Sequence, residues 1–328
     1  MRPFAYLRAT DARSAVTASR ERPNAMYLGG GTNLVDLMRL GVALPETLVD
    51  VTRISSGTVE EGPDGALLIG AGVRNGDLAA DPLVRRRHPM LAQAVLAGAS
   101  GQIRNMATVG GNLLQRTRCS YFQDVSKPCN KRLPGTGCPA REGDHRNLAV
   151  LGHSGDCVAT HPSDMAVALA ALGAIVHVEG RGGPRTVPMP GLHRLPGTEP
   201  ERDTVLEPDD LITLVEVPAL PFATRSRYRK VRDRASFAFA VVSVAAALDV
   251  ADGVVRDCRI ALGGVAHAPW RAESAEAALR GSAATEASFA EAVDAELAQA
   301  RPLPENGFKV PLARNVLIRT LVDLAEAS

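Results

Sequence analysis

The stretch YLGGGTNL, residues 27–34, places three glycines between a predicted strand and the start of a predicted helix. Glycines at such a turn let consecutive backbone N–H groups point toward one phosphate, and the helix N-terminus adds partial positive charge. The run lacks the G-x-G-x-x-G spacing of a Rossmann site. Because an ordinary strand-to-helix turn explains the glycines equally well, this loop alone predicts only a candidate phosphate-binding turn.

A second glycine loop, RNMATVGGN at residues 104–112, strengthens that interpretation. Its backbone amides, the Thr108 hydroxyl and the Asn112 amide are suited to phosphate and ribityl oxygens. Two such loops can hold one extended cofactor between them. The alternative is that Asn112 merely caps a turn, as asparagine often does.

The elements around these loops predict two α/β units. Hydrophobic periodicity and capping residues predict helices at 12–20, 34–40, 89–98 and 163–172, and strands at 25–28, 47–52, 66–72, 174–180 and 211–217. Three further strands are predicted at 227–232, 237–250 and 254–264, with Asp252-Gly253 as a hairpin turn. Helices at 271–280, 285–300 and 315–327 then complete an α+β unit.

Residues 100–161 lack clear periodicity and contain four of the five cysteines, Cys119, Cys129, Cys138 and Cys157. So long an irregular segment is unusual in a compact domain unless it binds something. The spacing matches neither the paired C-x₂-C of zinc ribbons nor the compact bacterial ferredoxin run. Zinc, an iron–sulfur cluster or two disulfides therefore stay open, whereas Cys258 is expected to be a core thiol.

Charge and hydropathy exclude several function classes. Lys plus Arg number 37 against 36 for Asp plus Glu, which gives no reason to expect nucleic acid as a partner. No apolar run reaches the roughly 20 residues of a membrane span, so a soluble protein is predicted. The first residues resemble neither a secretory signal nor a twin-arginine signal. We expect a cytoplasmic location, or a periplasmic one after folded export with a twin-arginine-bearing partner.

Taken together, the GGGTNL loop, the NMATVGGNLL loop, the HPSD segment at 161–164 and the KVR strand at 230–232 resemble the FAD-binding subunits of xanthine dehydrogenase family molybdenum hydroxylases. The resemblance implies an α+β chain: a two-subdomain FAD-binding fold of the vanillyl-alcohol oxidase type, then a CO-dehydrogenase-flavoprotein-like domain with a three-stranded sheet and helices. The implied parts are residues 1–55, residues 56–220 with an iron–sulfur insertion at about 113–160, and residues 221–328.

The resemblance also assigns candidate site residues. Asp164 would lie near the ribityl chain of the flavin, although an acid in the first turn of a helix is an equally good explanation. Lys230 would lie near the cofactor, whereas the strand pattern alone predicts a solvated lysine. The full FAD-binding set would be Leu28, Gly29, Gly30, Gly31, Thr32, Asn33, Leu34, Ala107, Thr108, Gly111, Asn112, Ser163, Asp164 and Lys230.

The segment RTRCSYFQDVSKPCNKRLPGTGCPAREG, residues 116–143, resembles the insertion that carries a [4Fe-4S] cluster in periplasmic aldehyde oxidoreductases. By this resemblance the four clustered cysteines would ligate such a cluster, and no side chain is assigned a catalytic role. The chain would belong to a heterotrimeric aldehyde oxidoreductase. A large subunit would hold the molybdenum cofactor, a small subunit would hold two [2Fe-2S] clusters, and this chain would pass electrons to a terminal acceptor.

Two rival functions remain at this stage. One is a free-standing FAD-dependent reductase or oxidase with the same flavin fold. The other is a zinc-stabilised binding module without a redox role.

Overall fold

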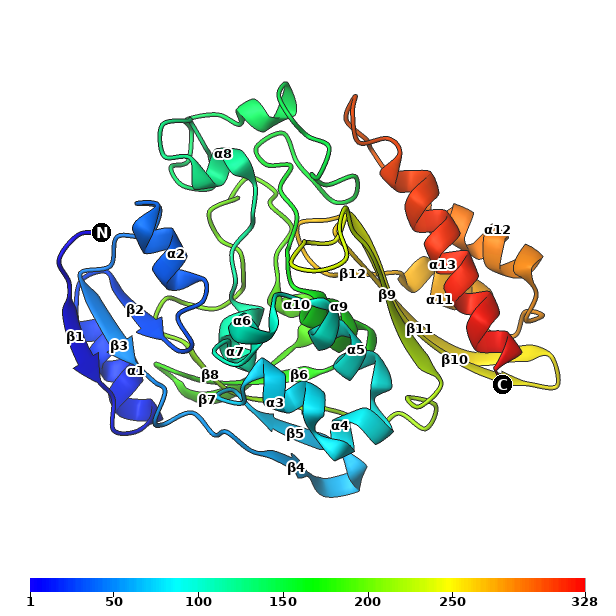
Figure 1. Ribbon diagram of the computed structural model, residues 1–328, viewed down its shortest axis with the longest axis horizontal. Coiled ribbons are helices and arrows are strands. Elements are labelled where there is room, and N and C mark those ends of the chain that lie inside the picture. The colour runs from blue at the N-terminus through cyan, green and yellow to red at the C-terminus, as the bar shows by residue number, and fades with distance from the viewer. Residues whose placement is uncertain (328) are drawn as a thin grey trace.

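Three β-sheets carry the fold of the computed structural model, which describes residues 1–327 (Figure 1). The first sheet is parallel, in the order β1-β3-β2. Its unit consists of β1 (Ala5–Arg8), α1 (Ala12–Glu21), β2 (Ala25–Leu28), α2 (Leu34–Arg39) and β3 (Thr47–Asp50). The predicted elements are confirmed, and β1 is an addition whose short, largely exposed sequence gave no periodic signal. Because α2 follows β2 directly, the first glycine loop lies at the carboxyl end of a strand.

The second sheet has five strands in the order β4-β5-β8-β6-β7. Its strands are β4 (Val59–Glu61), β5 (Leu67–Gly70), β6 (Ile175–Gly180), β7 (Gly183–Pro188) and β8 (Leu211–Val217). The helices of this unit are η1 (Pro63–Gly65), α3 (Asn75–Ala80), α4 (Pro82–Arg87), α5 (Pro89–Ala97), α6 (Gly101–Arg104), α7 (Val109–Leu113), α9 (Asp164–Ala171) and α10 (Met189–Leu192). Short helices such as α6 and α7 lie where the sequence predicted irregular structure.

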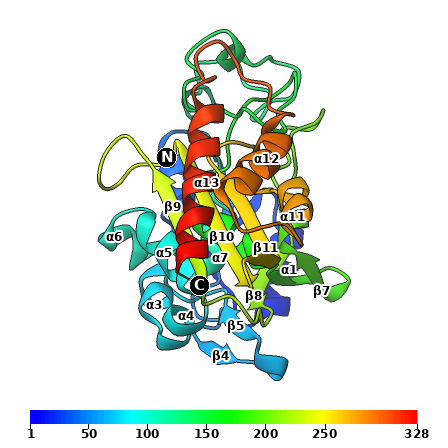
Figure 2. The same ribbon diagram turned by 90° about the vertical axis from the view of Figure 1, so that its right-hand side faces the viewer.

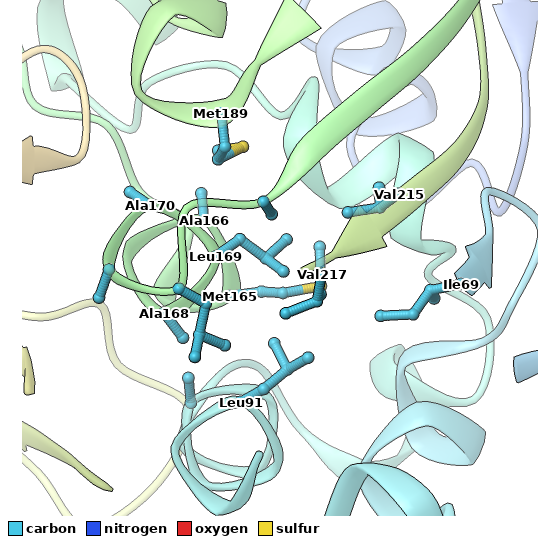
Figure 3. Close-up of a cluster of buried hydrophobic side chains, with 14 of the residues drawn as sticks. Ile69, Leu91, Met165, Ala166, Ala168, Leu169, Ala170, Met189, Val215 and Val217 are labelled. Carbon is cyan, nitrogen blue, oxygen red and sulfur yellow. The ribbon is translucent and has the colours of Figure 1, made fainter. Parts of the chain in front are cut away.

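Helix α9 is the centre of the main core. All eight of its residues, DMAVALAA, are buried. Met165 and Leu169 pack with Leu91 of α5 and with Ile69 and Val217 of the sheet (Figure 3). Burial on every side explains why its sequence is apolar all round instead of amphipathic. The position of the first residue of α9, Asp164, is therefore fixed by close packing.

The third sheet is antiparallel, in the order β12-β11-β10-β9, with α13 lying along it (Figure 2). Its unit consists of β9 (Ser226–Val231), β10 (Val242–Ala251), β11 (Val254–Gly263), β12 (Trp270–Arg271), α11 (Glu273–Leu279), α12 (Glu286–Leu297) and α13 (Lys309–Glu326). The hairpin at Asp252-Gly253 is confirmed, with φ of 54° and 72°. The sheet has one strand more than the three predicted. The extra strand, β12, was not predicted because two residues are too few to give an alternating pattern. Residues 237–241, predicted as strand, precede β10 instead.

Strand β10 joins two cores, and this explains its continuous apolar run. Val244, Ala246 and Leu248 pack with the C-terminal helices, whereas Ala245 and Ala247 belong to the core around α9. Alternate residues of a strand point to opposite faces, so a strand covered on both sides is apolar at every position. The C-terminal unit is therefore packed firmly against the helix that carries Asp164.

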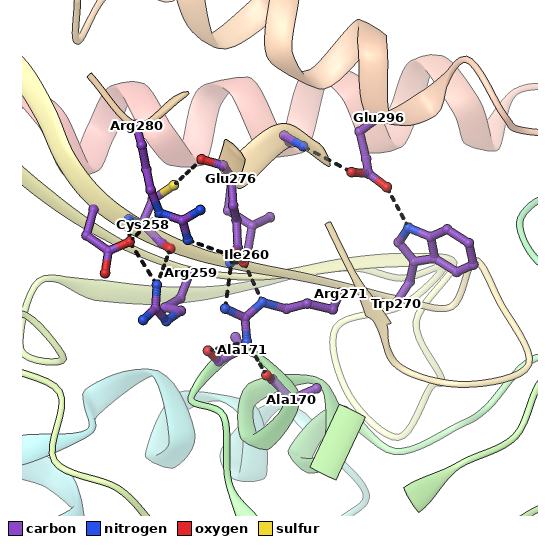
Figure 4. A network of polar contacts seen from close by, with 12 residues as sticks. Ala170, Ala171, Cys258, Arg259, Ile260, Trp270, Arg271, Glu276, Arg280 and Glu296 are labelled. Carbon is purple, nitrogen blue, oxygen red and sulfur yellow. Dashed lines mark hydrogen bonds and ion pairs between the residues drawn. The ribbon is translucent and has the colours of Figure 1, made fainter. Parts of the chain in front are cut away.

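An arginine network reinforces this junction (Figure 4). Arg271 donates to the Ala170 and Ala171 carbonyls at the end of α9, at 2.8 and 3.1 Å. Its guanidinium is also paired with Glu276. Because a cation at a helix C-terminus satisfies free carbonyls and interacts favourably with the helix dipole, the network holds α9 in place from the end opposite to Asp164.

The cysteine-bearing insertion is a separate lobe above the sheets, drawn green around α8 (Figure 1). It contains only α8 (Ser120–Gln123) and η2 (Pro139–Arg141) as helical turns. The C-terminal unit holds its end: Leu151 forms a bridge with Ala266, and the Lys309 ammonium donates to the Leu148 carbonyl at 2.9 Å. Within residues 1–327 there is no helix that combines the length and apolarity needed to span a membrane.

Lys309 gives a prediction for stability against pH. Burial lowers the pKa of this lysine from 10.5 to about 7. The unfolded chain therefore binds more protons than the folded chain between these values, and the contribution of Lys309 to stability rises as the pH increases from about 7 toward 10.5. We expect Lys309→Met to reduce the gain in unfolding free energy between pH 6.5 and 9, as measured in urea. An unchanged pH profile in the variant would contradict this.

Candidate functional site

The two glycine loops pack directly against each other. A Cβ added to Gly30 would lie 2.0 Å from the Met106 carbonyl oxygen, and one on Gly29 would lie 3.0 Å from Thr108 Oγ1. Gly31 has a φ of +74°, a conformation that favours glycine. The Cβ position of Gly30 faces the second loop, so glycine is required there for the contact between the loops. Its assignment as a phosphate contact stays a prediction.

A cavity of about 310 Å³ lies beside these loops, and we call it the glycine-loop cavity. Six predicted site residues line it: Thr32, Asn33, Ala107, Gly111, Asn112 and Asp164. The other predicted residues are not on its wall: Leu28, Gly29, Gly30, Gly31, Leu34, Thr108, Ser163 and Lys230. Their assignment as ligand contacts stays a prediction.

Thr108 and Ser163 do not line the cavity, but each holds a helix beside it in position. Thr108 Oγ1 accepts from the Gly111 N–H at 3.2 Å and caps α7. Ser163 Oγ caps α9, accepting from Ala166 N–H at 2.9 Å, and donates to Asn112 Oδ1 at 2.5 Å. Each hydroxyl thus fixes the start of a helix beside the cavity.

Two buried amide groups on the cavity wall have unused hydrogen-bonding atoms. Asn33 Oδ1 accepts from the Arg116 N–H at 2.9 Å, but Asn33 Nδ2 has no partner within the described chain. Asn75 Oδ1 also lacks one, and Asn75 is 3 % exposed. A buried polar atom without a partner is costly, so these two atoms suit a polar ligand. Asn75 was not among the predicted site residues, although it stands at the start of α3, soon after the buried strand β5.

Asp164 and Lys230 form a buried ion pair at the edge of the cavity. Their charged atoms are 2.8 Å apart, and the side chains are 7 % and 3 % exposed. The Tyr228 hydroxyl donates to Asp164, and Lys230 also donates to the Ala97 carbonyl at 3.0 Å. Burial and the adjacent carboxylate raise the pKa of Tyr228 well above its usual value. The prediction of a solvated Lys230 is therefore wrong. This lysine does not line the cavity, but it is paired with Asp164, which does.

This pair gives a second prediction. Lys230→Met should reduce the free energy of unfolding by about 3–5 kcal/mol, because the buried Asp164 carboxylate loses its cationic partner. Urea denaturation measures this loss. Adding Asp164→Asn to the same chain removes the stranded charge, so the double variant should recover part of the stability. Equal stability of the wild type and the single variant would contradict the prediction.

Two exposed phenylalanines belong to the cavity wall. Phe237 and Phe239 line it, and each lies under an arginine. The Arg234 guanidinium is 5.4 Å from the Phe237 ring centroid, and that of Arg118 is 5.1 Å from Phe239. Phe237 has a φ of +50°, which a strand cannot contain, so the predicted strand fails at this point.

A second cavity of about 280 Å³ adjoins the first and extends to the cysteine-bearing lobe. Arg118, Asp164 and Phe239 line both cavities, whereas Cys119 and His161 line only the second. His161 packs against His193 with ring centroids 4.1 Å apart, and burial lowers the pKa of both imidazoles. The first cysteine of the cluster therefore lies on a wall continuous with the glycine-loop cavity.

All four clustered cysteines line one small cavity, the cysteine cavity. Cys119, Cys129 and Cys157 are buried, and Cys138 is partly exposed. Every one is a free thiol, which contradicts the two-disulfide alternative. Phe122 and Val158 complete an apolar surround. Cysteines 9 to 38 positions apart in the sequence thus line one cavity, as their shared segment predicts.

Burial keeps three of the thiols around this cavity in the neutral form. Burial raises the pKa of Cys119 and Cys138, and raises that of Cys157 to about 12. These three thiols are therefore protonated at neutral pH. Among residues 1–327 no three His, Cys, Asp or Glu side chains converge as ligands of a single metal ion. The thiols surround the cavity without meeting at one point.

Comparison with protein families matches residues 2–220 to the FAD binding domain in molybdopterin dehydrogenase. Residues 226–324 match the CO dehydrogenase flavoprotein C-terminal domain. The two matches together span nearly the whole chain.

Known proteins match along the same length. The aldehyde oxidoreductase FAD-binding subunit PaoB of Escherichia coli is 48 % identical over 98 % of both chains. The carbon monoxide dehydrogenase medium chain of Hydrogenophaga pseudoflava is 29 % identical over 91 % of this chain and 88 % of its own. Among solved structures, carbon monoxide dehydrogenase from Hydrogenophaga pseudoflava matches 100 % of this chain and 99 % of that chain, with a TM-score of 0.76 and 28 % identity.

Proposed function

The chain belongs to the FAD-binding medium subunits of the xanthine dehydrogenase family of molybdenum hydroxylases, and on this premise we propose that it is the FAD and [4Fe-4S] electron-transfer subunit of a heterotrimeric aldehyde oxidoreductase. Membership makes it a flavoprotein and an oxidoreductase subunit. The identity of 48 % with an aldehyde oxidoreductase subunit favours aldehydes as the substrate class of the whole enzyme.

FAD fits the glycine-loop cavity, which we now call the flavin cavity. Asn33 Nδ2 and Asn75 Oδ1 offer one donor and one acceptor without a partner in the described chain, which suits the polar atoms of a dinucleotide. Asn112 presents a further amide, whose oxygen is already held by Ser163. When bound, the flavin supplies two-electron redox chemistry. The side chains bind and orient it, and the buried Asp164–Lys230 pair fixes the wall.

The chemistry of the donors around the cysteine cavity suits a [4Fe-4S] cluster. Four thiols line this cavity, and iron–sulfur clusters bind thiolate sulfur in preference to the other side chains on its wall. A cubane spreads its ligands over four iron atoms, which suits thiols that surround a cavity without converging on one point. A single zinc ion needs all four sulfurs about 2.3 Å from one centre. When bound, the cluster supplies one-electron transfer, and this chain's residues exclude water from it.

The proposed partners follow from the family. A large subunit would carry the molybdenum cofactor and oxidise the aldehyde, and a small subunit with two [2Fe-2S] clusters would deliver electrons to this chain. The terminal acceptor would then take them from the flavin. Because no side chain near the flavin cavity is needed as a general acid or base, we assign no catalytic residue.

The observation that carries the proposal is the placement of four free thiols around one cavity, of which Cys119 also lines the cavity that adjoins the flavin cavity. Its test is the anaerobic purification of the full-length chain, followed by analysis of iron, acid-labile sulfide and FAD. We expect one FAD and four irons per chain, and aldehyde oxidation only when the partner subunits are added. A colourless chain that holds zinc would refute the redox role, and turnover of aldehyde by the isolated chain would favour a free-standing enzyme.

A further inference from the structure

An ionic bridge connects the cysteine cavity to the flavin cavity. Lys131, two residues after Cys129, lines the cysteine cavity and is 2 % exposed. Its ammonium is paired with Asp203 Oδ1 and donates to the Pro200 carbonyl at 2.7 Å. A lysine so deeply buried requires a counter-charge, since an unpaired buried cation is strongly destabilising. Asp203 is that counter-charge, and it comes from the loop before β8.

Arg116 forms the other half of the bridge. Its Nε donates to Asp203 Oδ2 at 2.6 Å, and its guanidinium lies 4.8 Å from the centroid of the Phe122 ring on the cysteine cavity. Its backbone N–H donates to Asn33 Oδ1 at 2.9 Å. Asn33 belongs to the first glycine loop and lines the flavin cavity. A continuous series of contacts therefore runs from Lys131 beside Cys129, through Asp203 and Arg116, to Asn33 of the first glycine loop.

The bridge holds two cations and one anion. Burial alone would raise the pKa of Asp203, but Arg116 and Lys131 outweigh it and hold that pKa well below its usual range. His267 Nε2 lies 3.8 Å from Asp203 Oδ1, yet burial and Lys131 lower the pKa of His267 to about 4. This imidazole is therefore neutral at pH 7. The carboxylate of Asp203 is thus the group in the bridge that cancels the charge of Lys131.

We infer that Asp203 is a positioning residue for electron transfer: it fixes the cysteine loop against the flavin loop and cancels the charge of Lys131 beside the iron–sulfur cluster. The inference rests on the proposed function. A reduced cluster is more negative than an oxidised one, so a nearby uncompensated cation favours reduction. Removing the Asp203 charge should therefore make the reduction potential of the cluster more positive, and removing the Lys131 charge should make it more negative.

The test uses three variants of the full-length chain: Asp203→Asn, Lys131→Gln and the double variant. After iron and FAD analysis, the cluster of each is titrated under anaerobic conditions and followed by electron paramagnetic resonance. We expect a positive shift in the first, a negative shift in the second and a value near that of the wild type in the double variant. Asp294→Asn is a matched control, because its partner Arg314 lies on an exposed helix pair far along the chain.

The outcomes separate the two claims. A wild-type chain without iron contradicts the proposed function. A loaded wild type whose two single variants show no shift, or shift in the same direction, overturns the inference. If Asp203→Asn loses its cluster, Lys131→Gln and the conservative Asp203→Glu decide the matter. A more negative reduction potential in Lys131→Gln, together with an unchanged potential in Asp203→Glu, supports the bridge. An unchanged potential in Lys131→Gln overturns it.

Discussion

Cys129→Ser will remove most of the iron from the chain and leave most of the FAD bound. Cys129 lines the cysteine cavity with the three other thiols, and it does not line the flavin cavity. Serine is nearly the same size, but its hydroxyl is a hard oxygen donor and a poor replacement for a thiolate on iron. Iron and acid-labile sulfide should fall several-fold per chain, whereas extracted flavin should remain close to the wild-type amount.

Cys258→Ser is the matched control for this experiment. Cys258 is fully buried in β11, and its thiol contacts the Glu276 carbonyl at 3.7 Å, a contact that a serine hydroxyl can keep. It belongs to the C-terminal core and not to the cysteine cavity. The iron content of this variant should therefore equal that of the wild type. Retention of four irons in Cys129→Ser would show that this thiol is not a ligand.

Gly30→Val will abolish FAD retention. A Cβ on residue 30 would lie 2.0 Å from the Met106 carbonyl oxygen and 3.0 Å from Ala107 Cα, so the two glycine loops must move apart. Backbone cannot yield as a flexible side chain can, and Ala107 and Gly111 of the second loop form part of the cavity wall. The flavin-to-protein absorbance ratio after gel filtration should fall to a small fraction of the wild-type value.

Gly57→Val separates this effect from a general cost of replacing glycine. A Cβ on Gly57 would meet nothing within 4 Å, and its φ lies outside the left-handed region. This variant should keep its FAD and its melting temperature. Full flavin occupancy in Gly30→Val would mean that the loops separate without loss of the site, and our account of the cavity wall would be wrong.

Much of the fold could be predicted because its signals are local. The alternation of β11, the turn residues at Asp252-Gly253 and the capping box of α1, in which Ser14 N–H donates to Asp11 at 2.7 Å, act within a few residues. Elements without such signals were missed or misplaced. The strand β12 has two residues, and the apolar stretch at 237–241 begins with Phe237, whose positive φ breaks a strand. Apolar character alone does not distinguish a strand from an exposed loop.

The residues of the site also fall into two groups: those that the sequence indicates and those that only folding brings together. The two glycine loops, the HPSD segment and the KVR strand, taken in order, carry the resemblance to flavoprotein subunits, because such motifs are fixed by residue type and order along the sequence. Partners distant in sequence could not be predicted: Asn75 on the cavity wall, Met106 opposite Gly30, and Asp203 between Lys131 and Arg116. These pairings depend on how separate loops pack in space, and a one-dimensional pattern does not record the distance between atoms that only folding brings together.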